Sequence, residues 1–373
     1  MKTPAKHTHI INVRLKDARI ANGYTAKEVA KSISISPQAL SLYELGKSTP
    51  PPEIFNKLVV KYGLPVSFYY KPGFDNSMDG TIYFRKFTAA TKAKRNEAQI
   101  FSKWFVHDII AELNKMIKLP AVDPLFDRIK TSVHIDLDNF DYETMAKIIR
   151  REWGLGNEPL NDLMYEFEKR GIVICILDLD DDIDGFSYWS AGRPFMFLNA
   201  RNNFFRLRMS MAHELCHLFF HGAVEDIKHD LTKVENDAKN FAGAFLLPDI
   251  TCQKYFNSIS LQEFQYLKPQ LKISITGMLK RCEQLGFISE ERTVSLNKQI
   301  SAKRWRKVEP LDNIFPPERP VLAKQSVELI INNNILSKPQ LSNLFALPTD
   351  FIEYVCNLSK GYFSTSKILP IFI

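Results

Sequence analysis

The chain has 373 residues, of which 45% are hydrophobic and 24% are charged, so it can form two or three ordinary domains with apolar cores. Its five cysteines are scattered and include no C-x-x-C pair, which argues against a disulfide framework and for a reducing compartment. The apolar runs are far shorter than the about 18 residues of a membrane span, and the first residues lack the apolar segment of a secretory signal. We therefore expect a cytoplasmic protein with no membrane partner.

The positive charge is concentrated near the start of the chain. The net charge is +7, and residues 1–71 alone hold 11 Lys or Arg against 4 Asp or Glu, so the remainder is balanced. Such an asymmetry favours a polyanionic partner such as nucleic acid, although a solvated basic surface has the same composition.

This basic segment is expected to form a string of short helices. Thr25 precedes an acidic residue at the spacing of a capping box, and Ser36 precedes a proline suited to the first turn of a helix. Two short helices joined by a tight turn, Thr25–Lys31 and Ser36–Leu45, are typical of a helix-turn-helix. The second helix would then enter the major groove of DNA.

The string LKDARIANGYTAKEVAKSISISPQALSLYELGKSTPPPEIFNKLVVKYGLP resembles the Cro/repressor-type (XRE) helix-turn-helix. The resemblance implies DNA binding. On the second helix, Gln38 and Ser41 can hydrogen-bond a base edge, and Gln38 can make two bonds to an adenine. Phosphate contacts are expected from Arg14, Lys16, Lys27, Lys31 and Lys47. The candidate DNA-contacting residues are therefore Gln38, Ser41, Ser36, Lys27 and Lys47. A helix-turn-helix used only for protein docking or dimerisation is the alternative.

The middle of the chain combines a linker, helices and short strands. Lys71–Gly80 is rich in Pro, Gly, Asn and Asp, as linkers are, and Thr81–Leu119 has the apolar spacing of a helix. Further helices are expected at Tyr142–Trp153 and Leu160–Arg170. Short β-type runs follow at Ile172–Leu177, Gly185–Ser190 and Pro194–Leu198. The acidic run Asp178–Asp184 lacks the pattern of a calcium loop, so we interpret it as a solvated turn.

The segment Phe204–His221 has helical apolar spacing and contains the motif H-E-x-x-H. Positions four apart lie on one face of a helix, so His213 and His217 can direct two imidazole nitrogens at one ion. Glu214 is displaced around the helix, where it can reach a water bound to that ion. This is the arrangement of a zinc metalloprotease helix.

A catalytic zinc ion takes three protein ligands and keeps one open position. His221 lies one turn beyond His217, but three ligands along one straight helix would span about 12 Å, which is too far for metal bonds of about 2 Å. We therefore expect His221 to pack or to support the ligands. Glu235 begins the next amphipathic helix, and two helices that meet at an angle can bring it to the ion.

The strings RLRMSMAHELCHLFFH and VENDAKNFAGAFLLP together resemble the ImmA/IrrE family of metallopeptidase-like regulators, whose longer members are fused to an N-terminal helix-turn-helix. The resemblance implies that His213, His217 and Glu235 bind Zn²⁺ and that Glu214 is the catalytic base. It also implies a protein substrate, namely a helix-turn-helix repressor. Cys216 stands where the family usually has Gly, and we interpret it as a packing residue.

These observations predict a mainly α protein with a small β-sheet (α+β). The expected parts are an XRE-type helix-turn-helix domain at 1–71, a linker and helical scaffold at 72–160, a zincin-like metallopeptidase domain at 161–300 and a helical C-terminal region at 301–373.

The predicted function is a zinc-dependent regulatory endopeptidase, fused to a DNA-binding helix-turn-helix, that cleaves a repressor to control transcription and whose activity is conditional. The alternative is a transcriptional regulator or antitoxin-like DNA-binding protein whose zinc domain is structural or sensory.

Overall fold

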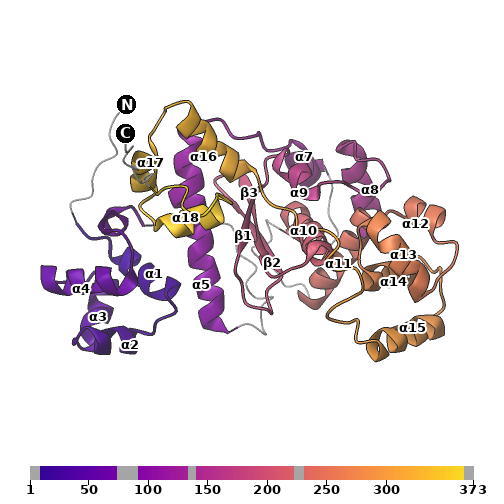
Figure 1. The fold of residues 1–373 in the computed structure, drawn as a ribbon, viewed down its shortest axis with the longest axis horizontal. Coiled ribbons are helices and arrows are strands. Elements are labelled where there is room, and N and C mark those ends of the chain that lie inside the picture. Colours follow the sequence, from indigo (N-terminus) through magenta and orange to yellow (C-terminus); the bar gives the residue numbers. More distant parts are fainter. Residues whose placement is uncertain (1–8, 74–90, 133–139, 222–230, 365–373) are drawn as a thin grey trace, which may run out of the picture. The chain divides into compact units, whose positions relative to one another are not determined.

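A computed structural model of the chain describes residues 9–73, 91–132, 140–221 and 231–364 (Figure 1). The chain divides into two compact units. In the described part, the first unit holds residues 9–73, 91–119 and 320–364, and the second unit holds residues 120–132, 140–221 and 231–319. The predicted fold class is confirmed, because most elements are helices and the described residues form one sheet of three strands.

The first unit is helical throughout its described part. Its elements are α1 (Asn12–Ala21), α2 (Ala26–Ser32), α3 (Pro37–Glu44), α4 (Pro52–Tyr62), the 3-10 turn η1 (Val66–Tyr70), α5 (Lys92–Lys103), the π-helical segment η3 (Trp104–Ile110), α6 (Ala111–Asn114), α16 (Leu322–Asn332), α17 (Lys338–Phe345) and α18 (Thr349–Val355).

Both predicted helix starts of the helix-turn-helix are confirmed. The Thr25 hydroxyl accepts a hydrogen bond from the backbone N–H of Glu28 (3.2 Å), and the Glu28 carboxylate accepts one from the Thr25 N–H (2.7 Å). The Ser36 hydroxyl caps α3 by accepting a hydrogen bond from the Ala39 N–H (3.1 Å). These bonds satisfy amide groups that the first turn of a helix leaves without a partner.

Helix α1 packs against α5, and a buried ion pair joins α1 to η3, the segment that continues α5. The Arg14 guanidinium donates to both carboxylate oxygens of Asp108 (2.7 and 2.9 Å) and to the Pro72 carbonyl. Lys71 lies 3.0 Å from the same carboxylate. The expectation that Arg14 contacts DNA phosphates is therefore wrong. Its side chain is buried, because a carboxylate from a distant helix satisfies its charge.

The helix expected at Thr81–Leu119 begins, in the described residues, at Lys92 and continues through η3 to Asn114. Its first part and most of the expected linker fall within residues 74–90, which lie outside the described residues. The C-terminal helices pack on it through aromatic rings, since Phe351 contacts both Phe101 (5.4 Å between centroids) and Trp104 (5.6 Å).

The second unit contains the sheet and the remaining helices. Its elements are α7 (Leu125–Ser132), α8 (Tyr142–Glu152), α9 (Leu163–Glu168), β1 (Val173–Leu177), β2 (Gly185–Ser190), β3 (Arg193–Asn199), α10 (Phe204–Cys216), the π-helical segment η5 (His217–His221), α11 (Leu231–Leu246), α12 (Asp249–Tyr255), α13 (Leu261–Leu271), α14 (Ile275–Gln284) and α15 (Glu290–Ala302).

The strand order is β1-β3-β2, and all three predicted strands are confirmed. Strand β1 pairs with β3 in parallel, and β2 pairs with β3 antiparallel so that Ser187 lies opposite Met196. Helix α10 packs on β2 and β3 on one side and on α11 on the other (Figure 1). Helix α8 packs in turn against α11.

An irregular segment after α15 is held to the second unit by buried carboxylates. Lys268, which is fully buried, donates to Glu309 (2.9 Å) and to Asp312 (2.6 Å). Glu318 pairs with the buried Arg208 and also accepts the N–H of Met164 (2.8 Å). Buried charges are tolerated only when they are paired in this way.

Among the described residues, no helix combines the length and the hydropathy that a membrane crossing requires. All five cysteines are buried thiols, and Cys216 lies in the apolar core of the second unit. The acidic run expected to form a turn is paired with arginines, since Arg201 contacts Asp178 and Asp181, and Arg206 contacts Asp184.

Asp17 is a buried carboxyl group on α1, and one of its oxygens has no hydrogen-bond partner within the described residues. Burial raises the pKa of Asp17 to about 6, and the nearby cations Arg14 and Lys103 offset only part of this effect. The protonated form is therefore favoured in the folded unit.

We expect Asp17 to make stability depend on pH. Because its pKa is higher in the folded state than in the unfolded state, its contribution is fully present below about pH 4 and is lost as the pH rises through about 6, by about 2–3 kcal/mol. Asp17→Asn should therefore raise the melting temperature of the first unit at pH 8 and change it little at about pH 3.5, where Asp17 is protonated in both the folded and the unfolded state. The exposed Asp350→Asn is the control, and equal effects of Asp17→Asn at both pH values would contradict the expectation.

Candidate metal centre

The helix that carries the H-E-x-x-H motif is held by its cap and by the sheet. Asn203 caps α10 by accepting a hydrogen bond from the N–H of Arg206 (2.9 Å). The apolar side of α10 is buried in the core of the second unit. His213 and His217 lie one turn apart on this helix, and both point toward Glu235 of α11.

Helix α11 approaches α10 through its predicted apolar stripe. The residues of this stripe are all buried: Ala238, Phe241, Ala242, Phe245 and Leu246. Alanine side chains allow two helix backbones to come close, and this is the condition for a side chain of α11 to reach the histidines. Glu235 lies three residues before the first residue of this stripe, Ala238, in the N-terminal part of α11.

The three predicted metal ligands lie together. The Nε2 atoms of His213 and His217 are 3.0 Å apart, and each lies 3.4 Å from a carboxylate oxygen of Glu235. Two ligands of a tetrahedral zinc ion, each about 2.0–2.1 Å from the metal, are separated by about 3.3–3.4 Å. The distances to Glu235 match this separation, and the distance between the imidazoles is slightly shorter. The donor set of two imidazoles and one carboxylate therefore fits a zinc ion.

Glu214 also has a carboxylate oxygen within 4.8 Å of the imidazole nitrogens of His213 and His217. Its other contacts differ, because the Ser187 hydroxyl donates to the Glu214 carboxylate (2.8 Å) from strand β2. Glu235 lies 3.4 Å from both imidazoles, so its carboxylate could complete a three-ligand set with them. Ser187 was not among the residues predicted from the sequence, because nothing in the sequence of a strand indicates which group a serine side chain will bond.

His221 supports the pair of histidines. Its Nδ1 atom lies 2.7 Å from the Nδ1 atom of His217, and its side chain is almost fully buried. If His217 binds metal through Nε2, its Nδ1 carries the proton and donates to His221. Such a bond orients the ring and selects the tautomer that a metal ligand needs.

The cluster lies near solvent on one side only. His213, Glu214 and His217 are each exposed by 7% or less, whereas the Glu235 side chain is 18% exposed. Apolar surroundings strengthen electrostatic interactions within such a site.

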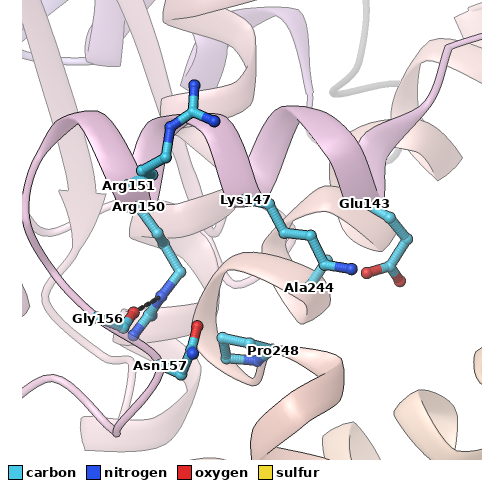
Figure 2. Close-up of a pocket in the computed structure, with 8 residues that line it drawn as sticks. All are labelled: Glu143, Lys147, Arg150, Arg151, Gly156, Asn157, Ala244 and Pro248. Atoms are coloured by element: carbon cyan, nitrogen blue, oxygen red, sulfur yellow. Dashed lines mark hydrogen bonds between the residues drawn. The ribbon is translucent and has the colours of Figure 1, made fainter.

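A separate pocket lies at the other end of α11 (Figure 2) and has a volume of about 240 Å³. The buried guanidinium of Arg150 binds three backbone carbonyls there, those of Gly156 (2.7 Å), Phe245 (2.6 Å) and Glu158 (2.8 Å). Burial lowers the pKa of Arg150 to about 10, so it stays charged at neutral pH. None of the pocket residues belongs to the histidine cluster. The contacts of Arg150 join α8 to α11, and they help to hold the helix that carries Glu235.

The structure places the five candidate DNA-contacting residues, Gln38, Ser41, Ser36, Lys27 and Lys47, at exposed positions of the helix-turn-helix. The Ser36 hydroxyl already accepts one hydrogen bond, because it caps α3. Leu42, on the same helix, is 42% exposed, and Leu45 just after it is 59% exposed. The face of α3 is therefore a mixture of polar and apolar side chains.

Comparisons with known proteins identify two domains. Residues 167–282 match the model of the IrrE N-terminal-like domain, and residues 15–69 match a helix-turn-helix model. A solved structure of a Mycobacterium tuberculosis transcriptional regulator is similar over 42% of this chain and 49% of its own length, with 17% sequence identity and a TM-score of 0.30. This chain thus covers about half of that regulator. No curated protein matches the sequence.

The contact between His217 and His221 predicts an effect on metal affinity. We expect His221→Phe to weaken zinc binding about 10- to 100-fold, because the ring of His217 loses the partner that orients it. Competition with a zinc-chelating dye measures the dissociation constant. His107→Phe, a change in the other unit, is the control. Unchanged zinc affinity in His221→Phe would show that His221 only fills space.

Proposed function

We propose that this chain, which carries an IrrE N-terminal-like domain and a helix-turn-helix domain, is a zinc-dependent regulatory endopeptidase. One observation carries this proposal: the Glu235 carboxylate, from a second helix, lies 3.4 Å from the Nε2 atoms of both His213 and His217. A protease-like domain combined with a helix-turn-helix is the architecture of a DNA-binding regulator.

The zinc ion would be held by the two imidazoles and by Glu235. When it is bound, zinc lowers the pKa of an adjacent water and polarises a peptide carbonyl. The residues of the chain supply the rest of the chemistry. His213 and His217 would bind the ion through Nε2, and the hydrogen bond between His217 and His221 would orient the His217 ring for this.

Glu214 is the proposed general base and acid. Its carboxylate accepts a hydrogen bond from the Ser187 hydroxyl at 2.8 Å and would accept the proton of the attacking water. The same carboxylate would then deliver this proton to the amine that leaves when the peptide bond breaks. Ser187 acts as a positioning residue, because it restricts the rotation of the side chain that moves the proton.

The helix-turn-helix is the proposed DNA-binding part. Lys27 and Lys47 are exposed and lie at the ends of the two-helix motif, where they would contact phosphates. Gln38 and Ser41 would face base edges. We further propose that the protein acts in the cytoplasm on a helix-turn-helix repressor, whose cleavage changes transcription.

The peptidase proposal predicts that zinc binding and repressor cleavage can be lost separately. Glu235→Ala should lose most of the bound zinc, because one of three ligands is missing. Glu214→Gln should keep the zinc but lose cleavage of a repressor about 10²- to 10⁴-fold, because the amide cannot accept a proton. Metal analysis and a gel-based cleavage assay measure the two properties, with the exposed Glu291→Gln as control. If Glu214→Gln cleaves as well as the wild type, the domain has a structural or sensory role instead.

The DNA proposal predicts a change in salt dependence. Neutralising Lys27 and Lys47 together should weaken binding to a random-sequence duplex and lower the slope of log K against log salt by about one for each lost phosphate contact. The control Lys298→Gln, on α15, should leave the slope unchanged. An identical slope in the double variant and the wild type would indicate that the helix-turn-helix docks protein rather than DNA.

A further inference from the structure

The second unit contains a larger pocket that is built in part from α10 and α11, the two helices that carry the proposed metal ligands. Its volume is about 800 Å³, which is within the range of about 300–1,000 Å³ that ligand pockets occupy. Its walls come from α10, α11, the start of α14 and the irregular segment after α15.

The pocket follows the same helix faces as the proposed metal ligands. Met209 lies four residues before His213 on α10, and Lys239 lies four residues after Glu235 on α11. Residues four apart share a helix face and are separated by about 6 Å along the axis. The pocket therefore starts about one helical turn from the metal centre on both helices. A peptide that leaves the centre along this seam enters the pocket.

The lining of the pocket is positively charged. Five of its side chains are cationic and two are carboxylates: Arg206, Lys239, Lys280, Arg306 and Lys307 against Glu309 and Asp312. Both carboxylates are already engaged, because each binds the buried Lys268 and Glu309 also accepts the N–H groups of Ile275 (2.7 Å) and Thr276 (2.9 Å). The five cations therefore outnumber two carboxylates that are already paired with a buried lysine.

Three of these cations have no carboxylate partner within the described residues: Lys239, Arg306 and Lys307. Arg206 pairs with Asp184 and Lys280 pairs with Glu283, but both of these pairs are exposed. The base of the pocket is apolar, with Phe205 and Met209. A ligand that fits has a flexible backbone, some apolar surface and several negative charges.

We propose that this pocket binds an acidic segment of the polypeptide substrate, close in sequence to the bond that is cleaved. This inference rests on the proposed function, because it names the substrate class of that same site. An acidic peptide supplies both the charges and the length to extend from the metal centre to Lys239 and Lys307. Electrostatic attraction of this kind acts on the rate of encounter and on the choice of partner.

Binding rather than cleavage tests this proposal. Full-length Glu214→Gln protein, in which a bound peptide would stay intact, is titrated into a fluorescein-labelled glutamate-rich peptide and into its counterpart with glutamine in place of glutamate. We expect the acidic peptide to bind more tightly at low salt. Adding Lys239→Gln and Lys307→Gln should weaken its binding about three- to tenfold. Adding Lys298→Gln, which removes the same kind of exposed charge outside the pocket, should not.

Several outcomes would overturn the proposal. These are equal affinity for the two peptides, an equal effect of Lys298→Gln, and full displacement of the peptide by inorganic phosphate, which would indicate a site for a small anion. Failure of the peptidase proposal gives a different result. In that case the wild type cleaves neither peptide nor repressor, while the acidic peptide still binds and still responds to Lys239→Gln and Lys307→Gln.

Discussion

The close apolar contact between α10 and α11 is the interaction on which the site depends. Each helix alone carries an incomplete set of donors, with two imidazoles on one and a carboxylate on the other. Burial of Ala238 and Ala242 lets the backbones approach, and burial of Phe241 and Phe245 fixes the angle at which they meet. Apolar burial of this size stabilises the pair by several kcal/mol, roughly 1.5–3 kcal/mol for each large side chain. That energy holds three polar side chains together in a place where they would otherwise separate.

The same two helices supply both the metal centre and the wall of the basic pocket. Four residues from the proposed metal ligands, α10 presents Met209 and α11 presents Lys239 to the pocket. The geometry of a helix thus links the reaction centre to the surface proposed to choose its substrate. A change in the crossing of α10 and α11 would disturb both properties together, because neither helix face can shift without moving the other set of residues.

The first unit shows a different use of charge. The basic composition near the start of the chain suggested that its cations face a polyanion, and Lys27 and Lys47 are indeed exposed. Arg14 instead pairs with the buried carboxylate of Asp108, which joins the helix-turn-helix to η3. Removing one partner of a buried ion pair strongly destabilises a fold, because the other charge is left buried without a partner. The contact between Arg14 and Asp108 therefore fixes the helix-turn-helix to η3.

Local chemistry made much of the protein predictable from its sequence. The H-E-x-x-H spacing, the caps at Thr25 and Ser36 and the three strands all follow from residues near one another in the chain, so periodicity and capping rules apply to them. The approach of Glu235 to the histidines was predictable because its helix carries a regular apolar stripe.

Tertiary structure alone decided the contacts between distant residues. The bond from Ser187 to Glu214, the burial of Arg14 against Asp108, the carbonyl cage around Arg150 and the shape of the basic pocket each join segments that are far apart in the sequence. A serine or an arginine has many possible partners of equal chemistry. Which partner it takes depends on how whole elements pack, and that is set by the summed burial of many apolar side chains rather than by any short pattern.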